Sequence, residues 1–94
     1  MKKISLSDYG PIISTEKEGS DIYNMIKNEL ENDSIQLDMS SIVSMTTYCA
    51  KQIFGKLYDD LGAENFFDKI QIKNATDSVK LTIRLGITMY ISRK

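Results

Sequence analysis

The side chains that could do chemistry in this chain gather in a short run of hydroxyl residues, Thr46, Thr47 and Tyr48. Residues 35–39 before the run alternate apolar and polar side chains, as a strand does, and residues 50–61 after it have helical spacing. The run therefore falls near a helix N-terminus, where unpaired backbone N–H groups and the helix dipole favour an anion. Phosphorylation of either threonine would place about −1.5 to −2 units of charge there. The more common role of such a threonine is a helix N-cap, worth about 1 kcal/mol.

Three other groups of polar side chains have simple structural explanations. Asp38 ends the strand before this loop, where it would either anchor a partner or, as is more common, brace the loop by accepting backbone N–H groups. Cys49 has no histidine near it in sequence, and a free cysteine is most often a small buried residue. Asp59 and Asp60 are neighbours on a predicted helix and point about 100° apart, so they do not converge on one cation.

Composition argues against several classes of function. The 94 residues are expected to form a single domain, 1–94, and a formal net charge of −1 gives no basic excess for nucleic-acid binding. No run of about 18 apolar residues indicates a membrane helix, and the polar start does not match a signal peptide. One cysteine and no histidine leave no internal disulfide, common metal-ligand set or nucleophile–base pair. We expect a cytoplasmic chain that is not an enzyme and uses no metal or cofactor.

Turn signals and periodicity predict the first half of the fold. Residues 2–7 and 11–15 are expected to form a hairpin, because a Tyr-Gly-Pro turn signal separates two β-prone runs. Ser20 is the expected N-cap of a first helix over residues 20–32. The strand at residues 35–39 follows that helix, so a βαβ crossover with parallel pairing is expected.

The second half is predicted to continue with a helix over residues 47–61. Gly62 suits the position after the helix, where a left-handed backbone carries no Cβ penalty. Residues 64–67 are expected to connect this helix to a short alternating strand at residues 69–73.

Residues 79–91 give conflicting signals. Their strict alternation favours a strand, yet the segment is more than twice the common strand length of about 5–6 residues. A cap-like loop at Thr76 and Asp77 precedes them, and a largely apolar helix can pack against a sheet or a partner. Periodicity alone favours the strand. Gly55 and Gly86 interrupt apolar patterns, which predicts that another backbone approaches closely at each.

Short motifs recur in a recognisable order over nearly the whole chain. They are Gly-Pro-Ile-Ile-Ser-Thr at 10–15, Gly19, Leu-Asp-Met at 37–39, Ile-Phe-Gly-Lys-Leu at 53–57, Leu-Gly-Ala-Glu at 61–64 and Lys-Ile-Gln-Ile-Lys-Asn at 69–74. In this order and spacing the chain resembles the STAS-like domains, relatives of the STAS domains of anti-sigma factor antagonists and sulphate transporters. The resemblance implies one STAS-like α/β domain with a four-stranded mixed sheet, three helices and a helical final element.

The phosphoacceptor motif of the antagonists is degenerate in this chain. In that family an Asp-Ser-Ser-Gly motif begins the second helix, and a partner kinase phosphorylates its second serine. Thr46, Thr47, Tyr48 and Cys49 occupy those four positions here. The STAS-like pattern Ser-Phe-Ala-Asp-Glu-Leu-Phe-Gly falls on residues 48–55, with its alanine, last phenylalanine and glycine retained and its two acidic residues replaced by lysine and glutamine.

The expected function is that of a small protein-interaction module whose loop and helix at residues 40–61 bind a protein partner. The resemblance implies a regulatory role, with partner switching by an ATP-binding anti-sigma-type kinase. The alternative is a self-associating homodimer that uses the apolar last element. The candidate partner-binding or phosphorylation residues are Asp38, Ser44, Thr46, Thr47, Tyr48, Lys51 and Gln52.

Overall fold

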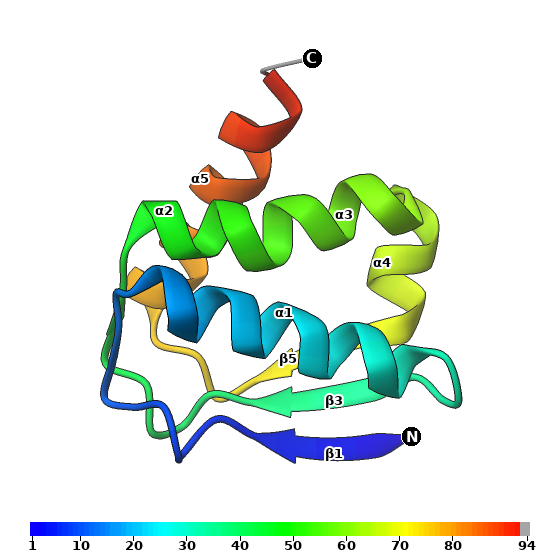
Figure 1. Cartoon of the computed structure of the whole chain (residues 1–94), viewed down its shortest axis with the longest axis horizontal. Helices are drawn as coiled ribbons and strands as arrows, with labels where there is room; N and C mark the ends of the chain where they lie inside the picture. The colour runs from blue at the N-terminus through cyan, green and yellow to red at the C-terminus, as the bar shows by residue number, and fades with distance from the viewer. Residues whose placement is uncertain (93–94) are drawn as a thin grey trace.

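The computed structural model describes residues 1–92 and contains a parallel three-stranded sheet under a layer of helices (Figure 1). Strands β1 (Lys2–Ser5), β3 (Ile35–Asp38) and β5 (Ile70–Lys73) lie in the order β1-β3-β5. Their alternating apolar residues are buried beneath the helices, while most residues of the opposite face are polar and at least partly exposed. The sheet is therefore covered on one face. The predicted crossover is confirmed, because β1 and β3 are parallel.

The predicted hairpin and the single four-stranded mixed sheet are wrong. Strand β2 (Ile12–Ile13) does not pair with β1; it pairs in parallel with β4 (Ser44–Met45) in a separate two-stranded sheet. The physical reason is visible at Leu6, which is fully buried and whose N–H donates to the carbonyl of Asp38, so the chain continues along β3 beyond β1. The carbonyl of Pro11 then accepts hydrogen bonds from the N–H groups of Val43 and Ser44, at the start of β4, which fixes β2 beside that strand.

Helix α1 (Glu16–Leu30) begins four residues before the predicted Ser20 cap. Its N-cap is Thr15, whose side chain accepts a hydrogen bond from the backbone N–H of Glu18 while the Glu18 carboxylate accepts from the Thr15 N–H. This reciprocal capping box satisfies two backbone donors at once and outweighs a lone serine cap. Gly19 consequently lies inside the helix instead of at its boundary.

The helix predicted over residues 47–61 is present and consists of three continuous segments. These are α2 (Thr47–Ala50), the π-helical segment η1 (Lys51–Gly55) and α3 (Lys56–Leu61). Gly62, at φ 83°, ends it as predicted. The expected connection after it is instead a further helix, α4 (Ala63–Lys69), stabilised by the buried ring of Phe66 beside Tyr58. The chain thus has more than the three helices expected.

The final element is a helix, α5 (Asp77–Ser92), as the resemblance implied and against the strand periodicity. Val79, Ile83 and Gly86 are its buried positions and lie at helical spacing. A Cβ added at Gly86 would lie 2.7 Å from the carbonyl carbon of Ala50, and one at Gly55 would lie 3.0 Å from the carbonyl oxygen of Gly86. The predicted close approaches are confirmed: the two glycines allow α5 to cross the long helix almost backbone to backbone.

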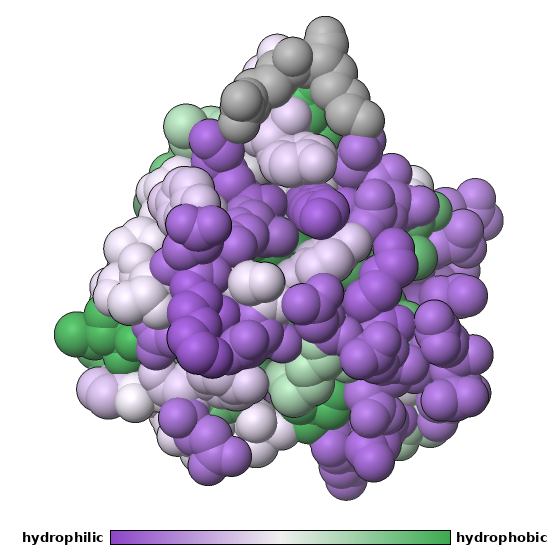
Figure 2. All heavy atoms as spheres, viewed as in Figure 1, coloured by the Kyte–Doolittle hydropathy of each residue, from purple (hydrophilic) through white to green (hydrophobic). Residues whose placement is uncertain are grey.

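The hydrophobic core lies between the sheet and the helices. Its fully buried side chains include Ile22 and Ile26 from α1, Leu37 from β3 and Phe54 from η1. Hydrophilic residues cover most of the face shown in Figure 2, with apolar atoms in small patches between them. Among residues 1–92, no helix is long and apolar enough to cross a membrane.

Candidate functional site

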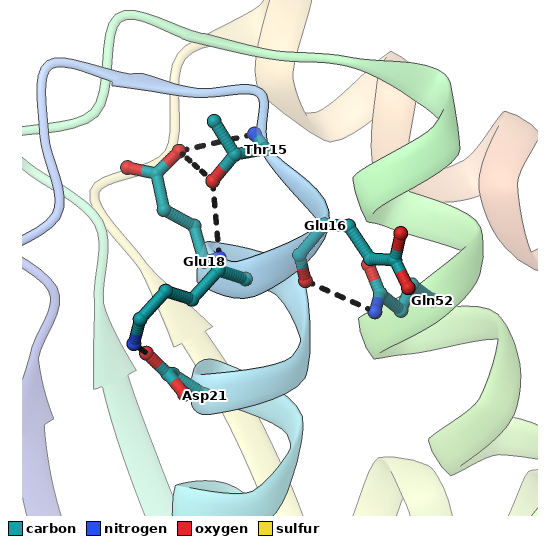
Figure 3. Close-up of polar contacts among 6 residues, drawn as sticks. Thr15, Glu16, Glu18, Asp21 and Gln52 are labelled. Atoms are coloured by element: carbon teal, nitrogen blue, oxygen red, sulfur yellow. Dashed lines mark hydrogen bonds and ion pairs between the residues drawn. The ribbon is translucent and has the colours of Figure 1, made fainter.

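The start of the long helix is attached directly to the start of α1. The backbone N–H of Thr46 donates to the carbonyl of Ile13 at 3.0 Å. The thiol of Cys49 donates to the Thr15 carbonyl at 3.4 Å. One turn later the side-chain amide of Gln52 donates to the carbonyl oxygen of Glu16 at 3.2 Å (Figure 3). Contacts between segments more than thirty residues apart in sequence therefore position this loop.

Of the two candidate threonines, Thr46 is the N-cap. Its backbone is extended, with φ −71° and ψ 152°, and its side-chain oxygen accepts a hydrogen bond from the Cys49 N–H at 3.1 Å. Thr47 is the first helical residue and is half-buried. The capping interpretation of this run is thus correct for Thr46, whose hydroxyl retains a hydrogen atom that it can donate outward.

The side chains that face outward around this cap are few and mixed in character. Val43 is 65% exposed and Tyr48 is 52% exposed, and Ser44 is exposed between them in sequence. Met45 and Cys49 alternate with them and are buried in the core. An exposed valine and an exposed tyrosine thus flank, in sequence, the hydroxyl residues of this loop. Val43 had no place among the sequence candidates, since one exposed valine in a loop has no periodic signal.

Lys51 and Gln52 are half-buried on η1. Gln52 packs against Gly19 of α1 so tightly that a Cβ at Gly19 would overlap its side-chain oxygen. That oxygen is buried and has no hydrogen-bond partner among the described residues, although the amide nitrogen is bound to α1. Gln52 therefore contributes to the α1 contact, and Lys51 is left as the charged group of this segment.

Asp38 lies on the opposite, open face of the sheet, away from the other candidates. Its carboxylate accepts hydrogen bonds from the side-chain amide of Asn74 at 3.1 Å and from the Ser40 N–H at 3.0 Å, and these bonds lower its pKa below the ordinary aspartate value. It lines a shallow hollow of about 450 Å³ together with Lys3, Gln36 and Lys73. The sequence grouped Asp38 with the hydroxyl loop, but the structure makes it a brace between two strand ends.

Asp60 also has a structural contact that the sequence did not indicate. Its carboxylate accepts a hydrogen bond from the Tyr23 hydroxyl and forms an ion pair with Lys27 at 3.0 Å, which joins α3 to α1. Burial raises the pKa of Asp60, but the hydrogen bonds from Tyr23 and Lys27 outweigh it and leave the pKa below its ordinary value. Asp60, the second of the two adjacent aspartates, therefore stabilises the contact between α3 and α1. Across residues 1–92, no three histidine, cysteine or acidic side chains are grouped to hold a metal ion.

These features define a class: a small α/β domain with a one-sided parallel sheet and a strand–loop–helix junction at its edge. A family model described as "STAS-like domain of unknown function (DUF4325)" matches residues 18–80. The chain therefore belongs to the STAS-like domain family. Searches of curated proteins and of solved structures gave no match.

Proposed function

We propose that this chain is a non-catalytic protein-interaction module that binds a protein partner through residues 40–61. The observation that carries the proposal is the exposure of Val43 and Tyr48 beside the capped start of α2, where packing against the core does not require them. Tyrosine is enriched at protein interfaces and among the residues that carry most of their binding energy. Membership in the STAS-like family supports the same location, since in the related anti-sigma factor antagonists a partner kinase phosphorylates a serine at the start of the second helix.

The regulatory form of this proposal is partner switching by an ATP-binding anti-sigma-type kinase. Thr46, Thr47 and Tyr48 are the hydroxyl residues available to such a kinase at the helix start. A phosphoryl group there would meet the unpaired N–H groups of the helix N-terminus and would change the charge of the binding surface. Mass spectrometry of the chain purified from its own cell would test this directly. Phosphate on none of the three residues under any growth condition would remove the switching role.

The binding surface can be tested by affinity capture from the same cell. The double variant Val43→Ser with Tyr48→Ser removes the exposed apolar area without changing charge, and we expect it to lose the partner. The control is Leu81→Ser with Leu85→Ser, which makes a similar change on α5. Both variants should retain the wild-type circular dichroism spectrum. Equal capture by the wild type and the Val43/Tyr48 variant would contradict the proposal.

A second candidate function is self-association through α5. Leu81, Leu85 and Met89 are 55%, 46% and 45% exposed and follow one another at four-residue steps, which aligns them along one side of the helix. On another side of α5, a hollow of about 310 Å³ between α5 and the α4–β5 segment has apolar walls from Phe67 and Ile87. Exposed apolar patches of this kind mark association surfaces.

Light scattering separates the two functions with the same pair of variants. If the chain is a homodimer through α5, the wild type and the Val43/Tyr48 variant have twice the monomer mass, while the Leu81/Leu85 variant has the monomer mass. A wild-type chain that remains monomeric at high concentration would exclude the homodimer.

A further inference from the structure

A hollow lies on the outer side of η1, where the C-terminal part of α5 crosses it. Its volume is about 270 Å³, and it is lined by Tyr48, Lys51, Gln52, Lys56 and Tyr90. We call it the lysine hollow. It adjoins the proposed binding loop through Tyr48, which belongs to both. Tyr90 comes from α5, where its Cβ lies against Gly55, so the crossing of the two helices forms one wall.

The π-helical turn brings the two lysines to the same side of the helix. The backbone N–H of Lys56 donates to the carbonyl of Lys51, a bond that joins residues five apart. In an ordinary α-helix, residues five apart point about 140° from each other, because each residue turns the chain by about 100°. The wider π turn, closed by this i→i+5 bond, brings position i+5 closer to the side of position i. Both lysines therefore line one hollow, which their sequence spacing would not predict.

Among the described residues, the lining of this hollow contains two lysines and no acidic side chain. Lys51 forms no ion pair with any residue in 1–92, in contrast to Lys17 and Lys27, which both bind aspartates. The ammonium of Lys56 lies over the ring of Tyr23, 4.4 Å from its centroid.

The charge of Lys56 also helps to lower the pKa of Asp60. The Asp60 carboxylate, however, forms its ion pair with Lys27. Lys51 and Lys56 therefore give the lining of the hollow two positively charged groups, on a chain whose formal net charge is −1.

We propose that the lysine hollow receives carboxylate side chains from an acidic segment of a protein partner, with Lys51 and Lys56 supplying the charge and Tyr48 and Tyr90 the walls. The inference rests on the proposed function and names the chemistry of the partner. The hollow is open and smaller than the roughly 300–1,000 Å³ typical of sites that enclose a small molecule. It suits one or two side chains of a segment that lies across the surface and also contacts Tyr48. Tyrosine is enriched among the residues that carry interface binding energy, and complementary charge steers and orients a partner.

The test is fluorescence anisotropy of purified full-length chain with fluorescein-labelled hexaglutamate, and with hexaglutamine of the same length as the uncharged probe. We expect hexaglutamate to bind, hexaglutamine not to bind, and binding to weaken with salt. Lys51→Glu should weaken hexaglutamate binding by about tenfold, and Lys51→Gln by less. The matched control is Lys2→Glu, the same charge change on exposed β1, which should weaken binding less than about twofold. Circular dichroism melting checks that each variant is folded.

Equal weakening by Lys51→Glu and Lys2→Glu would overturn the proposal, because it would show attraction to net charge alone. Equal binding of both peptides, or displacement of hexaglutamate by millimolar inorganic phosphate, would also overturn it. Failure of the inference and of the proposed function are distinguishable. If the Val43/Tyr48 variant loses its partner but hexaglutamate does not bind, the interaction surface stands and the acidic partner segment is wrong. If hexaglutamate binds at Lys51 but capture is unaffected by the Val43/Tyr48 change, the surface at residues 43–48 is wrong.

Discussion

The starts of α1 and α2 use the same capping residue in different ways. Each helix is preceded by a threonine in an extended conformation, and each threonine accepts a hydrogen bond of 3.1 Å from the backbone N–H three residues later. The residue that donates this bond is Glu18 in α1 and Cys49 in α2. Glu18 returns the interaction, because its carboxylate accepts hydrogen bonds from the N–H groups of Ser14 and Thr15.

Cys49 cannot return the interaction, and the structure compensates through tertiary contacts. The N–H of Thr46 donates to Ile13, and the buried Cys49 thiol donates to the carbonyl of Thr15. The start of α1 is therefore satisfied locally, whereas the start of α2 is held by the start of α1. Tyr48, in the first turn of α2, is 52% exposed, and it belongs to the proposed binding surface.

The largest expected loss of stability comes from placing glutamate, which completes the capping box of α1, at the equivalent position of α2. Cys49→Glu would bury a carboxylate in a site that is fully inaccessible to solvent and lacks a cation, so we expect a loss of more than about 3 kcal/mol in the free energy of unfolding. Urea denaturation followed by circular dichroism measures this. Cys49→Ser is the control for loss of the thiol and should cost much less. A stable Cys49→Glu variant would mean that the two helix starts are interchangeable.

Removing the α1 cap should have the next largest effect. Thr15→Ala deletes the acceptor for the Glu18 N–H and leaves the Glu18 carboxylate without one of its partners, so we expect a loss near the upper end of the capping range, about 2 kcal/mol. Thermal and urea unfolding measure it. Thr15→Ser keeps the hydroxyl and should retain most of the stability. A loss confined to Thr15→Ser, with Thr15→Ala unaffected, would contradict a capping role.

Removing the α2 cap should be less harmful. Thr46→Ala loses one hydrogen bond to Cys49 but keeps the backbone bond to Ile13, so we expect a loss of about 1 kcal/mol. The same denaturation experiment, run beside the Thr15 variants, ranks the two starts. Thr46→Ser is the matched control. If Thr46→Ala were the more destabilising of the two alanine variants, the start of α2 would not depend mainly on its tertiary contacts.

The sequence predicted the parts of the fold that depend on local signals. The helix ending at Gly62 and the strands around residues 35–39 and 69–73 follow from periodicity and a glycine terminator. The hairpin was mispredicted because a turn signal shows where the chain bends, not which strand it pairs with afterwards. The helix in α5 was hidden by an alternation in which every second apolar residue is exposed; the length of the segment and the cap-like loop before it argued against a strand, and the family resemblance favoured the helix.

The site was predictable in part for the same reason. A capping role for Thr46 or Thr47 follows from the strand–loop–helix pattern, whereas the choice of Thr46 and the exposure of Tyr48 come from the structure. A local signal for Thr15 is also present, since threonine followed three residues later by glutamate is a capping box, and it is a stronger signal than the lone serine at Ser20. The π turn that pairs Lys51 with Lys56 has no such signal, because it arises where Gly86 of α5 packs against the helix. The position of Asp38 on the open face of the sheet, bound to Asn74, also has no local signal, because it depends on which strands pair.

The smallest expected effect is a pH dependence at the α1 start. The backbone N–H groups of Ser14 and Thr15, followed by the Thr15 hydroxyl, lower the pKa of Glu18 below its ordinary value. A carboxylate with a lowered folded pKa stabilises the protein above its unfolded pKa of about 4.3, and this contribution is lost as the pH falls through the folded value. Glu18→Gln should therefore be less stable than the wild type at neutral pH, and the two should converge in acid. Glu16→Gln, the same charge change in the same turn without the box, controls for the helix dipole. Urea midpoints measured from neutral pH downward give the comparison.

A stability difference between the wild type and the Glu18→Gln variant that persists unchanged below the folded pKa of Glu18 would contradict this prediction. It would show that the ionised carboxylate does not set α1 apart from α2.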